Sequence, residues 1–199
     1  GVAGLQAIAT ARRLGGVVSG YDVRPEVKTQ IESLGAKFVE LPLEAGSGEG
    51  GYAKEMGEEF YRRQRELMAV TLAESDLVVT TAAVPGKKAP VLITKEMVEG
   101  MRPGSVVVDL AAERGGNCEL TQPGERIVHQ GVVILGPLNL PSSLAHHASM
   151  LYSKNLATFV LNMTKDGALK PDSDDQIVKE SLLCKGGEVV NERVKELLV

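Results

Sequence analysis

The chain of 199 residues opens on two glycines, Gly1 and Gly4, and an acidic residue, Asp22, stands 21 positions after the first. The first four residues fit the last four positions of the pattern G-x-G-x-x-G, where glycine lets backbone approach a pyrophosphate and a helix pack closely on a strand. The same pattern includes an acid about 20 positions further on, which bonds adenosine ribose hydroxyls. The spacing predicts a dinucleotide site; the alternative is an ordinary glycine turn beside a solvated aspartate.

The acid also bears on which dinucleotide would bind. A carboxylate at Asp22 repels a 2′-phosphate and favours NAD over NADP, whereas a nearby arginine such as Arg24 can accommodate that phosphate. Because Asp22 stands at the end of the expected strand itself, the sequence favours NAD(H).

Five short apolar runs are expected to form the strands that position these residues. Most are continuous rather than alternating, which is typical of strands buried on both faces of a parallel sheet. The expected strands are residues 17–21, 38–41, 77–81, 106–110 and 132–135. Helical patterns alternate with them over residues 5–14, 24–34, 58–73 and 94–99. This alternation predicts an α/β fold, a Rossmann-type doubly wound parallel sheet.

The pattern changes after the last of these strands. Residues 136–143 read as a loop, 145–165 as one long helix, and 172–199 as a tail with strand-like pieces at 177–183 and 188–190. We therefore expect a dinucleotide-binding domain over 1–140, and a C-terminal helix and tail over 141–199 that pack on a second domain. In the strand order 3-2-1-4-5-6 the central strand comes just before the glycine loop, so we also expect a first strand and an N-terminal domain that precede Gly1.

Composition excludes several other classes of function. The formal net charge is −4 and aromatic residues make up only 4% of the chain, which argues against a nucleic-acid partner. No stretch of 18 apolar residues is present, so no membrane span is expected. The two cysteines, Cys118 and Cys184, and the three histidines have no metal-ligand spacing, and no metal site is predicted.

Several motifs in order along the chain are similar to those of the alanine dehydrogenase and nicotinamide nucleotide transhydrogenase family. They are residues 1–7, 21–24, 50–60, 80–86, 109–118 and 139–142. The most specific is 50–60, GGYAKEMGEEF, which looks like the lid of the NAD(H)-binding component of a proton-translocating transhydrogenase. There, Tyr52 would cover the cofactor.

The resemblance implies a site and a division of labour. Its cofactor-binding residues would be Gly1, Val2, Asp22, Val23, Arg24, Gly51, Gln64 and Ala83. No catalytic residue is implied, because hydride passes directly between two nicotinamides. A partner component would hold NADP(H) and a membrane component would carry protons. A homodimer, peripheral on the cytoplasmic side of the inner membrane, is expected from the family.

Two other functions stay open. A self-contained alanine dehydrogenase needs a proton-handling group near the nicotinamide, and Glu113 is the only candidate, where that branch has an aspartate. Glu113 can equally be structural or solvated. A non-catalytic NAD-binding module is the third possibility, and a dedicated lid argues against it.

Overall fold

The computed structural model describes residues 1–40, 58–84, 86–172 and 174–198, without the side chains of 58–61 and 197. These residues form two compact units, Gly1–Leu138 and Asn139–Val199.

Parallel strands form the centre of the first unit. β1 (Ser19–Gly20) pairs with β2 (Lys37–Phe38) in parallel. A four-stranded sheet has the order β3-β4-β6-β5, in which β3 (Leu77–Thr80), β4 (Val106–Asp109) and β6 (Val132–Leu135) are parallel. The predicted α/β fold with a parallel sheet is confirmed, and each of the five expected apolar runs overlaps a strand, the second of them only at Phe38.

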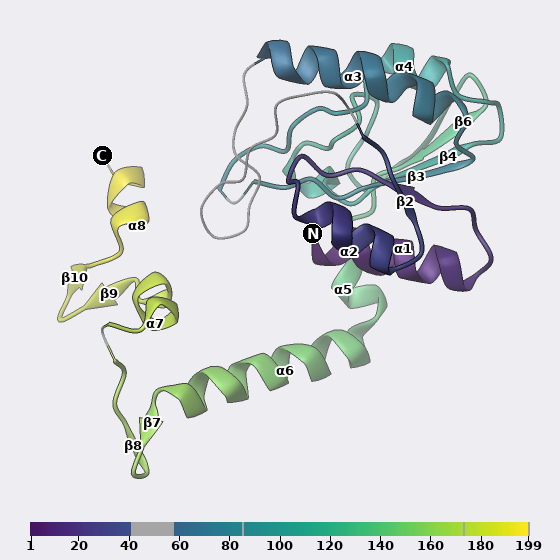
Figure 1. Cartoon of the computed structure of the whole chain (residues 1–199). Coiled ribbons are helices and arrows are strands. Elements are labelled where there is room, and N and C mark those ends of the chain that lie inside the picture. The colour runs from purple at the N-terminus through teal and green to yellow at the C-terminus, as the bar shows by residue number, and fades with distance from the viewer. Residues whose placement is uncertain (41–57, 85, 173, 199) are drawn as a thin grey trace. The chain divides into compact units, whose positions relative to one another are not determined.

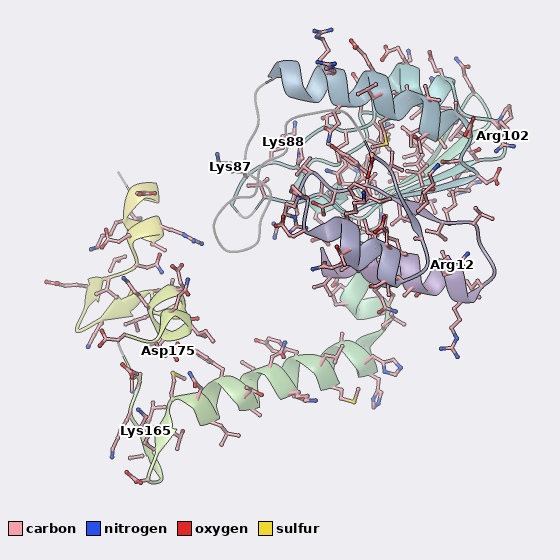
Figure 2. The ribbon with its side chains drawn as sticks, viewed as in Figure 1. Arg12, Lys87, Lys88, Arg102, Lys165 and Asp175 are labelled. Atoms are coloured by element: carbon pink, nitrogen blue, oxygen red, sulfur yellow. The ribbon has the colours of Figure 1, made fainter. Side chains whose placement is uncertain are left out.

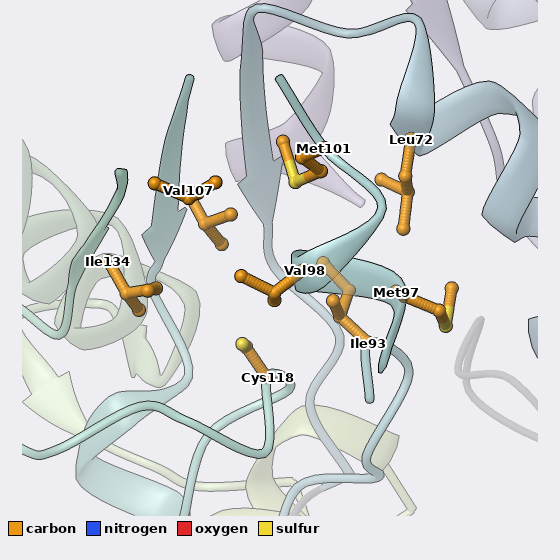
Figure 3. Packing of buried hydrophobic residues seen from close by; sticks show 9 residues of the cluster. Leu72, Ile93, Met97, Val98, Met101, Val107, Cys118 and Ile134 are labelled. Carbon is orange, nitrogen blue, oxygen red and sulfur yellow. The ribbon is translucent and has the colours of Figure 1, made fainter. Parts of the chain in front are cut away.

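Helices cover the strands of this unit on two sides (Figure 1). α3 (Glu58–Ala73) and α4 (Lys95–Glu99) lie on one side, and α1 (Val2–Arg13) and α2 (Val27–Ser33) on the other. Figure 3 shows the main core, in which Leu72 of α3 and Val98 of α4 pack with Val107 and Ile134 of the sheet. A smaller cluster joins α1 and α2 to β1 and β2.

One strand of this unit was not predicted. β5 (Arg126–His129) pairs antiparallel with β6 at the end of the sheet. Its residues alternate between exposed and half-buried, so it lacks the continuous apolar run that identified the other strands. The turn into β6 has positive φ at Gln130 (47°) and Gly131 (83°), which suits a two-residue hairpin.

The second unit is mainly helical. It contains α5 (Leu140–Ser143), α6 (Ala145–Asn162), α7 (Gln176–Ser181) and α8 (Glu192–Leu197). Two hairpins accompany them: β7 (Thr164–Lys165) with β8 (Ala168–Leu169), and β9 (Cys184–Lys185) with β10 (Glu188–Val189). Among the described helices, none has the length and apolar character needed to cross a membrane.

Three expectations for this unit were wrong. Residues 177–183, expected to be strand-like, are mostly helix α7, because the Asp175 carboxylate accepts the backbone N–H groups of Ile177 and Val178 and caps a helix there. The long helix stops at Asn162 rather than at 165, since a hairpin turn with positive φ follows at Asp166 and Gly167. The expected loop 136–143 ends in the short helix α5.

Candidate dinucleotide-binding site

The N-terminus of α1 is open to an anion. Gly1 is the N-cap residue, and the cap has no side-chain hydrogen bond and no acid in the first turn. A Cβ added at Gly1 would have no described atom within 4 Å. A helix start with unpaired N–H groups and positive dipole attracts phosphate. The backbone at Gly1 is therefore accessible to a pyrophosphate.

Gly4 brings the start of α1 close to the end of β3. A Cβ at Gly4 would lie 3.2 Å from Oγ1 of Thr81, which directly follows β3. This close approach is the role of the third glycine in a dinucleotide loop. It places the glycine loop beside the segment that leads to Ala83.

Asp22 stands directly beyond β1 and next to the glycine loop. Its Oδ2 lies 3.6 Å from the Gly1 nitrogen. Oδ1 accepts hydrogen bonds from the Arg24 backbone N–H (3.0 Å) and Nε (2.9 Å), and Oδ2 accepts one from Nη2 (2.8 Å). The acid, the glycine and the arginine thus form one cluster.

The charge state of Asp22 follows from opposing effects. Burial raises the pKa of Asp22, but the hydrogen bonds and charge of Arg24, with the positive charge at the Gly1 nitrogen, outweigh it and hold the pKa below its ordinary value. In turn, the side-chain bond to Asp22 raises the pKa of Arg24. Asp22 is therefore an acceptor at neutral pH, as bonding to ribose hydroxyls requires.

Gln64 reaches the same region from α3. Its side chain is 3% exposed, and its Nε2 donates to the Tyr21 hydroxyl at 2.9 Å. The amide Oε1 of Gln64 is buried and, among the described residues, has no hydrogen-bond partner. A buried acceptor without a donor is costly, and a nucleotide donor would satisfy it. This orphaned oxygen, with the open Gly1 backbone, fits a bound dinucleotide.

The remaining expected residues are placed as follows. Ala83 is exposed on the loop after β3, and Val23 is half-buried between Asp22 and Arg24. Gly51 and Tyr52, with residues 50–57 of the expected lid, lie outside the described residues. Exposure leaves Ala83 accessible, and it stands at the carboxyl end of a parallel strand, where ligands bind in this kind of sheet.

Basic residues lie at both ends of the parallel strands. Arg102 precedes β4 and hydrogen-bonds the carbonyl of Glu74, just before β3. Lys87 and Lys88 follow β3. Figure 2 shows Arg102 at one end of the first unit and the two lysines at the other. The candidate site belongs to the lysine end.

The sequence did not reveal a buried polar network at this end of the sheet. The Asp109 carboxylate, 0% exposed at the end of β4, accepts five hydrogen bonds. Its donors are the hydroxyls of Thr80 and Thr121 and the backbone N–H groups of Ala111, Asn117 and Cys118. The available signal was an acid in the last part of an apolar run and an asparagine eight positions later, directly after a glycine pair.

The remaining candidates from the sequence are Glu113 and the three histidines. Glu113 is exposed on the 3-10 turn Ala112–Arg114. His129 contacts Glu99 at 2.8 Å, and the exposed rings of His146 and His147 contact each other. No group of three or more metal-ligating side chains occurs within residues 1–40, 58–84, 86–172 and 174–198.

Comparisons with known proteins identify a family whose members resemble this chain in sequence and fold. The family model "Alanine dehydrogenase/PNT, C-terminal domain" matches residues 1–192. An NAD(P) transhydrogenase subunit alpha protein of Rhodospirillum rubrum is 50% identical over 196 residues, which cover 96% of this chain and 51% of that protein. Alanine dehydrogenase of Bacillus subtilis is 32% identical over 132 residues, covering 64% of this chain and 35% of that enzyme.

A solved structure shows the same fold. The transhydrogenase of Sinorhizobium meliloti superimposes with a TM-score of 0.77 at 48% identity, covering 96% of this chain and 50% of the other. The chain thus spans about half the length of these transhydrogenase proteins. With a parallel sheet, a glycine loop and a family model that matches nearly every residue, the chain belongs to the alanine dehydrogenase/PNT family, as its C-terminal domain.

Proposed function

We propose that this chain is the NAD(H)-binding part of a proton-translocating NAD(P) transhydrogenase. It binds NAD(H) and positions it for direct hydride transfer to NADP⁺ on a partner component, coupled to proton movement. The observation that carries the proposal is the placement of the Asp22 carboxylate beyond β1, with Oδ2 3.6 Å from the Gly1 nitrogen. The Asp22 carboxylate suits the hydroxyls of a ribose, and the backbone at Gly1 suits a pyrophosphate.

Each residue has a distinct task in this proposal. Gly1 and Val2, at the start of α1, hold the pyrophosphate. Asp22 accepts the ribose hydroxyls, and Val23 and Arg24 complete the adenosine side. Gln64 offers its buried Oε1 to a donor of the nucleotide. Further along the cofactor, Ala83 lies at the nicotinamide end, and Gly51 contacts the nucleotide from the lid.

Hydride transfer makes few chemical demands on the protein. The bound nicotinamide supplies the hydride, and the chain binds, orients and shields it. Because the hydride passes from carbon to carbon, no general acid or base is needed. The exposure of Glu113 is consistent with this, since a proton-handling group is expected in a site that excludes water.

Similarity to the family's two branches favours transhydrogenation over alanine oxidation. Identity is 50% to a transhydrogenase subunit over nearly the whole chain, against 32% to an alanine dehydrogenase over about two thirds of it. Glu113 also stands where the dehydrogenase branch has an aspartate. Transhydrogenation is therefore the function we propose, in preference to amino-acid oxidation.

The proposal extends to the assembly. The partners are an NADP(H)-binding component and a membrane component, and the NAD(H)-binding protein is a homodimer at the cytoplasmic face of the membrane. Residues 1–140 form the NAD(H)-binding domain, and 141–199 pack on a second domain. The many exposed apolar residues of α6, such as Leu151 and Leu161, are consistent with a packing role.

One assay tests the function. The intact protein is mixed with NADH and an NADP(H)-binding partner component, and transfer to a nicotinamide analogue is followed by absorbance. Transfer that requires the partner supports the proposal. Oxidation of alanine with NAD⁺, or formation of alanine from pyruvate, ammonia and NADH without the partner, would instead establish the dehydrogenase.

A further inference from the structure

We propose that Asn117 is a positioning residue for hydride transfer, which acts by fixing the peptide that presents Ala83. This inference rests on the proposed function. It concerns a buried side chain that itself reaches no cofactor, and it begins from the hydrogen bonds of its amide.

Asn117 joins three segments of the first unit. It is 0% exposed. Its Oδ1 accepts the Ala82 N–H at 2.9 Å, and its Nδ2 donates to the carbonyls of Ala82 (2.9 Å) and Pro90 (2.8 Å). The orientation of the amide is fixed by chemistry, because only the NH₂ group can donate to two carbonyls.

The backbone of Asn117 is held equally firmly. Its N–H donates to Asp109 Oδ2 at 2.7 Å, and its carbonyl accepts from Leu92 (2.8 Å) and Ile93 (3.0 Å). Asp109 in turn accepts the Thr80 hydroxyl at 3.0 Å. Asn117 is therefore anchored to the ends of β3 and β4 before it contacts the loop beyond β3.

The hold on Ala82 determines where the next peptide group points. The Ala82 carbonyl and the Ala83 N–H belong to one planar peptide unit, which is trans, so they point in opposite directions. Since the Ala82 carbonyl is directed at the buried Asn117, the Ala83 N–H is directed away from it. Asn117 thus sets the orientation of a donor at the nicotinamide end of the proposed site.

Orientation matters more to the reaction than to nucleotide affinity. Transfer between two nicotinamides needs close and aligned carbons, and small misplacements have large effects on rate. The adenosine side is held by other residues, Asp22 and Gln64, whereas the hydrogen bonds of the Asn117 amide go to Ala82 and Pro90. Loss of the Asn117 amide is therefore expected to slow transfer while leaving the adenosine side intact.

The test uses two variants of the intact protein and one matched control. Asn117→Ala removes all three side-chain bonds, and Asn117→Asp keeps the acceptor but removes the donor to both carbonyls. Thr121→Val removes one bond, of 2.7 Å, to the same Asp109 carboxylate and touches neither Ala82 nor Pro90. For each protein, single-turnover hydride transfer with the partner component and the Kd of AMP are measured, with Tm as the fold readout.

We expect the Asn117 variants to lower the rate of hydride transfer while leaving AMP affinity nearly unchanged. Transfer should fall roughly tenfold or more in the Asn117 variants, with the AMP Kd within about twofold of the unmodified protein. Thr121→Val should lower Tm but leave transfer nearly unchanged. If Asn117→Ala does not fold, Asn117→Asp carries the test alone.

Two results would overturn the inference. One is a transfer rate in the Asn117 variants that matches Thr121→Val. The other is a loss of AMP affinity equal to the loss of rate, which indicates a merely structural role. Failure of the proposed function is distinguishable, because then the unmodified protein itself shows no transfer with the partner.

Discussion

Arg24 closes back onto Asp22, two positions earlier, with Nη2 2.8 Å from Oδ2 and Nε 2.9 Å from Oδ1. The arginine that a 2′-phosphate would need is thus engaged by the acid that a 2′-hydroxyl would need. This pairing at the end of β1 supports the proposal that the site takes NAD(H), because the Arg24 charge is compensated by Asp22.

The Asp22–Arg24 pair predicts a pH dependence of stability. The pKa of Asp22 is lower in the folded protein than in the unfolded chain, so the carboxylate stabilises the fold fully above the unfolded pKa and loses its contribution as pH falls through the folded pKa. The difference in unfolding free energy between the unmodified protein and Asp22→Asn should stay constant from pH 7 to about 5 and shrink below about 4. Urea unfolding at several pH values measures it. A difference that grows on acidification would contradict the sign.

The buried contact between Gln64 and Tyr21 predicts non-additive effects on stability. Among the residues that the structure describes, Tyr21→Phe leaves neither polar atom of the Gln64 amide with a partner, and it should cost about 1–3 kcal/mol of unfolding free energy. Gln64→Leu added to Tyr21→Phe should recover part of that loss, since both partners are then apolar. A double-mutant cycle from denaturant unfolding checks this. Additive effects, within about 0.3 kcal/mol, would show that the bond has no stabilising role.

Gly136, directly after β6, is predicted to tolerate no side chain. A Cβ there would lie 2.5 Å from the backbone oxygen of Gln122, so Gly136→Ala forces the main chain to move. The expected cost is about 3 kcal/mol or more in unfolding free energy. Gly100→Ala is the matched control, because its Cβ would approach described atoms no closer than 3.5 Å. Equal stability of the two variants would refute the close packing of β6 on the preceding turn.

The two cysteines predict a difference in reactivity. Burial raises the pKa of Cys118, and the thiol is 1% exposed in the main core (Figure 3), whereas Cys184 is exposed. Because the thiolate is the reactive form, a chromogenic disulfide should react rapidly with Cys184 and with Cys118 only after unfolding. The check is stopped-flow absorbance on the protein and its Cys184→Ser variant. Rapid reaction in that variant would contradict the packing of Cys118.

The sequence predicted the parallel strands well because β4 and β6 are continuous apolar runs, a pattern with a direct physical cause. It missed β5, whose residues alternate in burial, and it misread α7, where the Asp175 cap overrides a short apolar run. A short element such as β5 or α7 can be predicted only when one local signal, the apolar pattern or a helix cap, outweighs the others.

The residues of the candidate site were predictable where they follow a known sequence spacing. Gly1 and Asp22 follow a known spacing, and the structure places them 3.6 Å apart. Asn117 and Ala82 are 35 positions apart, and their contact depends on how the segments that follow β3 and β4 meet beyond the strand ends. No spacing rule predicts a bond of that kind, so the buried network became visible only in three dimensions.

Asp22 and the glycine loop are proposed to hold NAD(H), and a titration with NADH measures that binding. NADH is titrated into the intact protein, into Asp22→Ala, and into Asp76→Ala as a control that removes a carboxylate at the opposite end of the sheet, which contacts Arg102. We predict a loss of NADH affinity of about 1.5–3 kcal/mol, tenfold to a hundredfold, in Asp22→Ala. The control should bind like the unmodified protein. Equal NADH affinity in all three proteins would contradict the account.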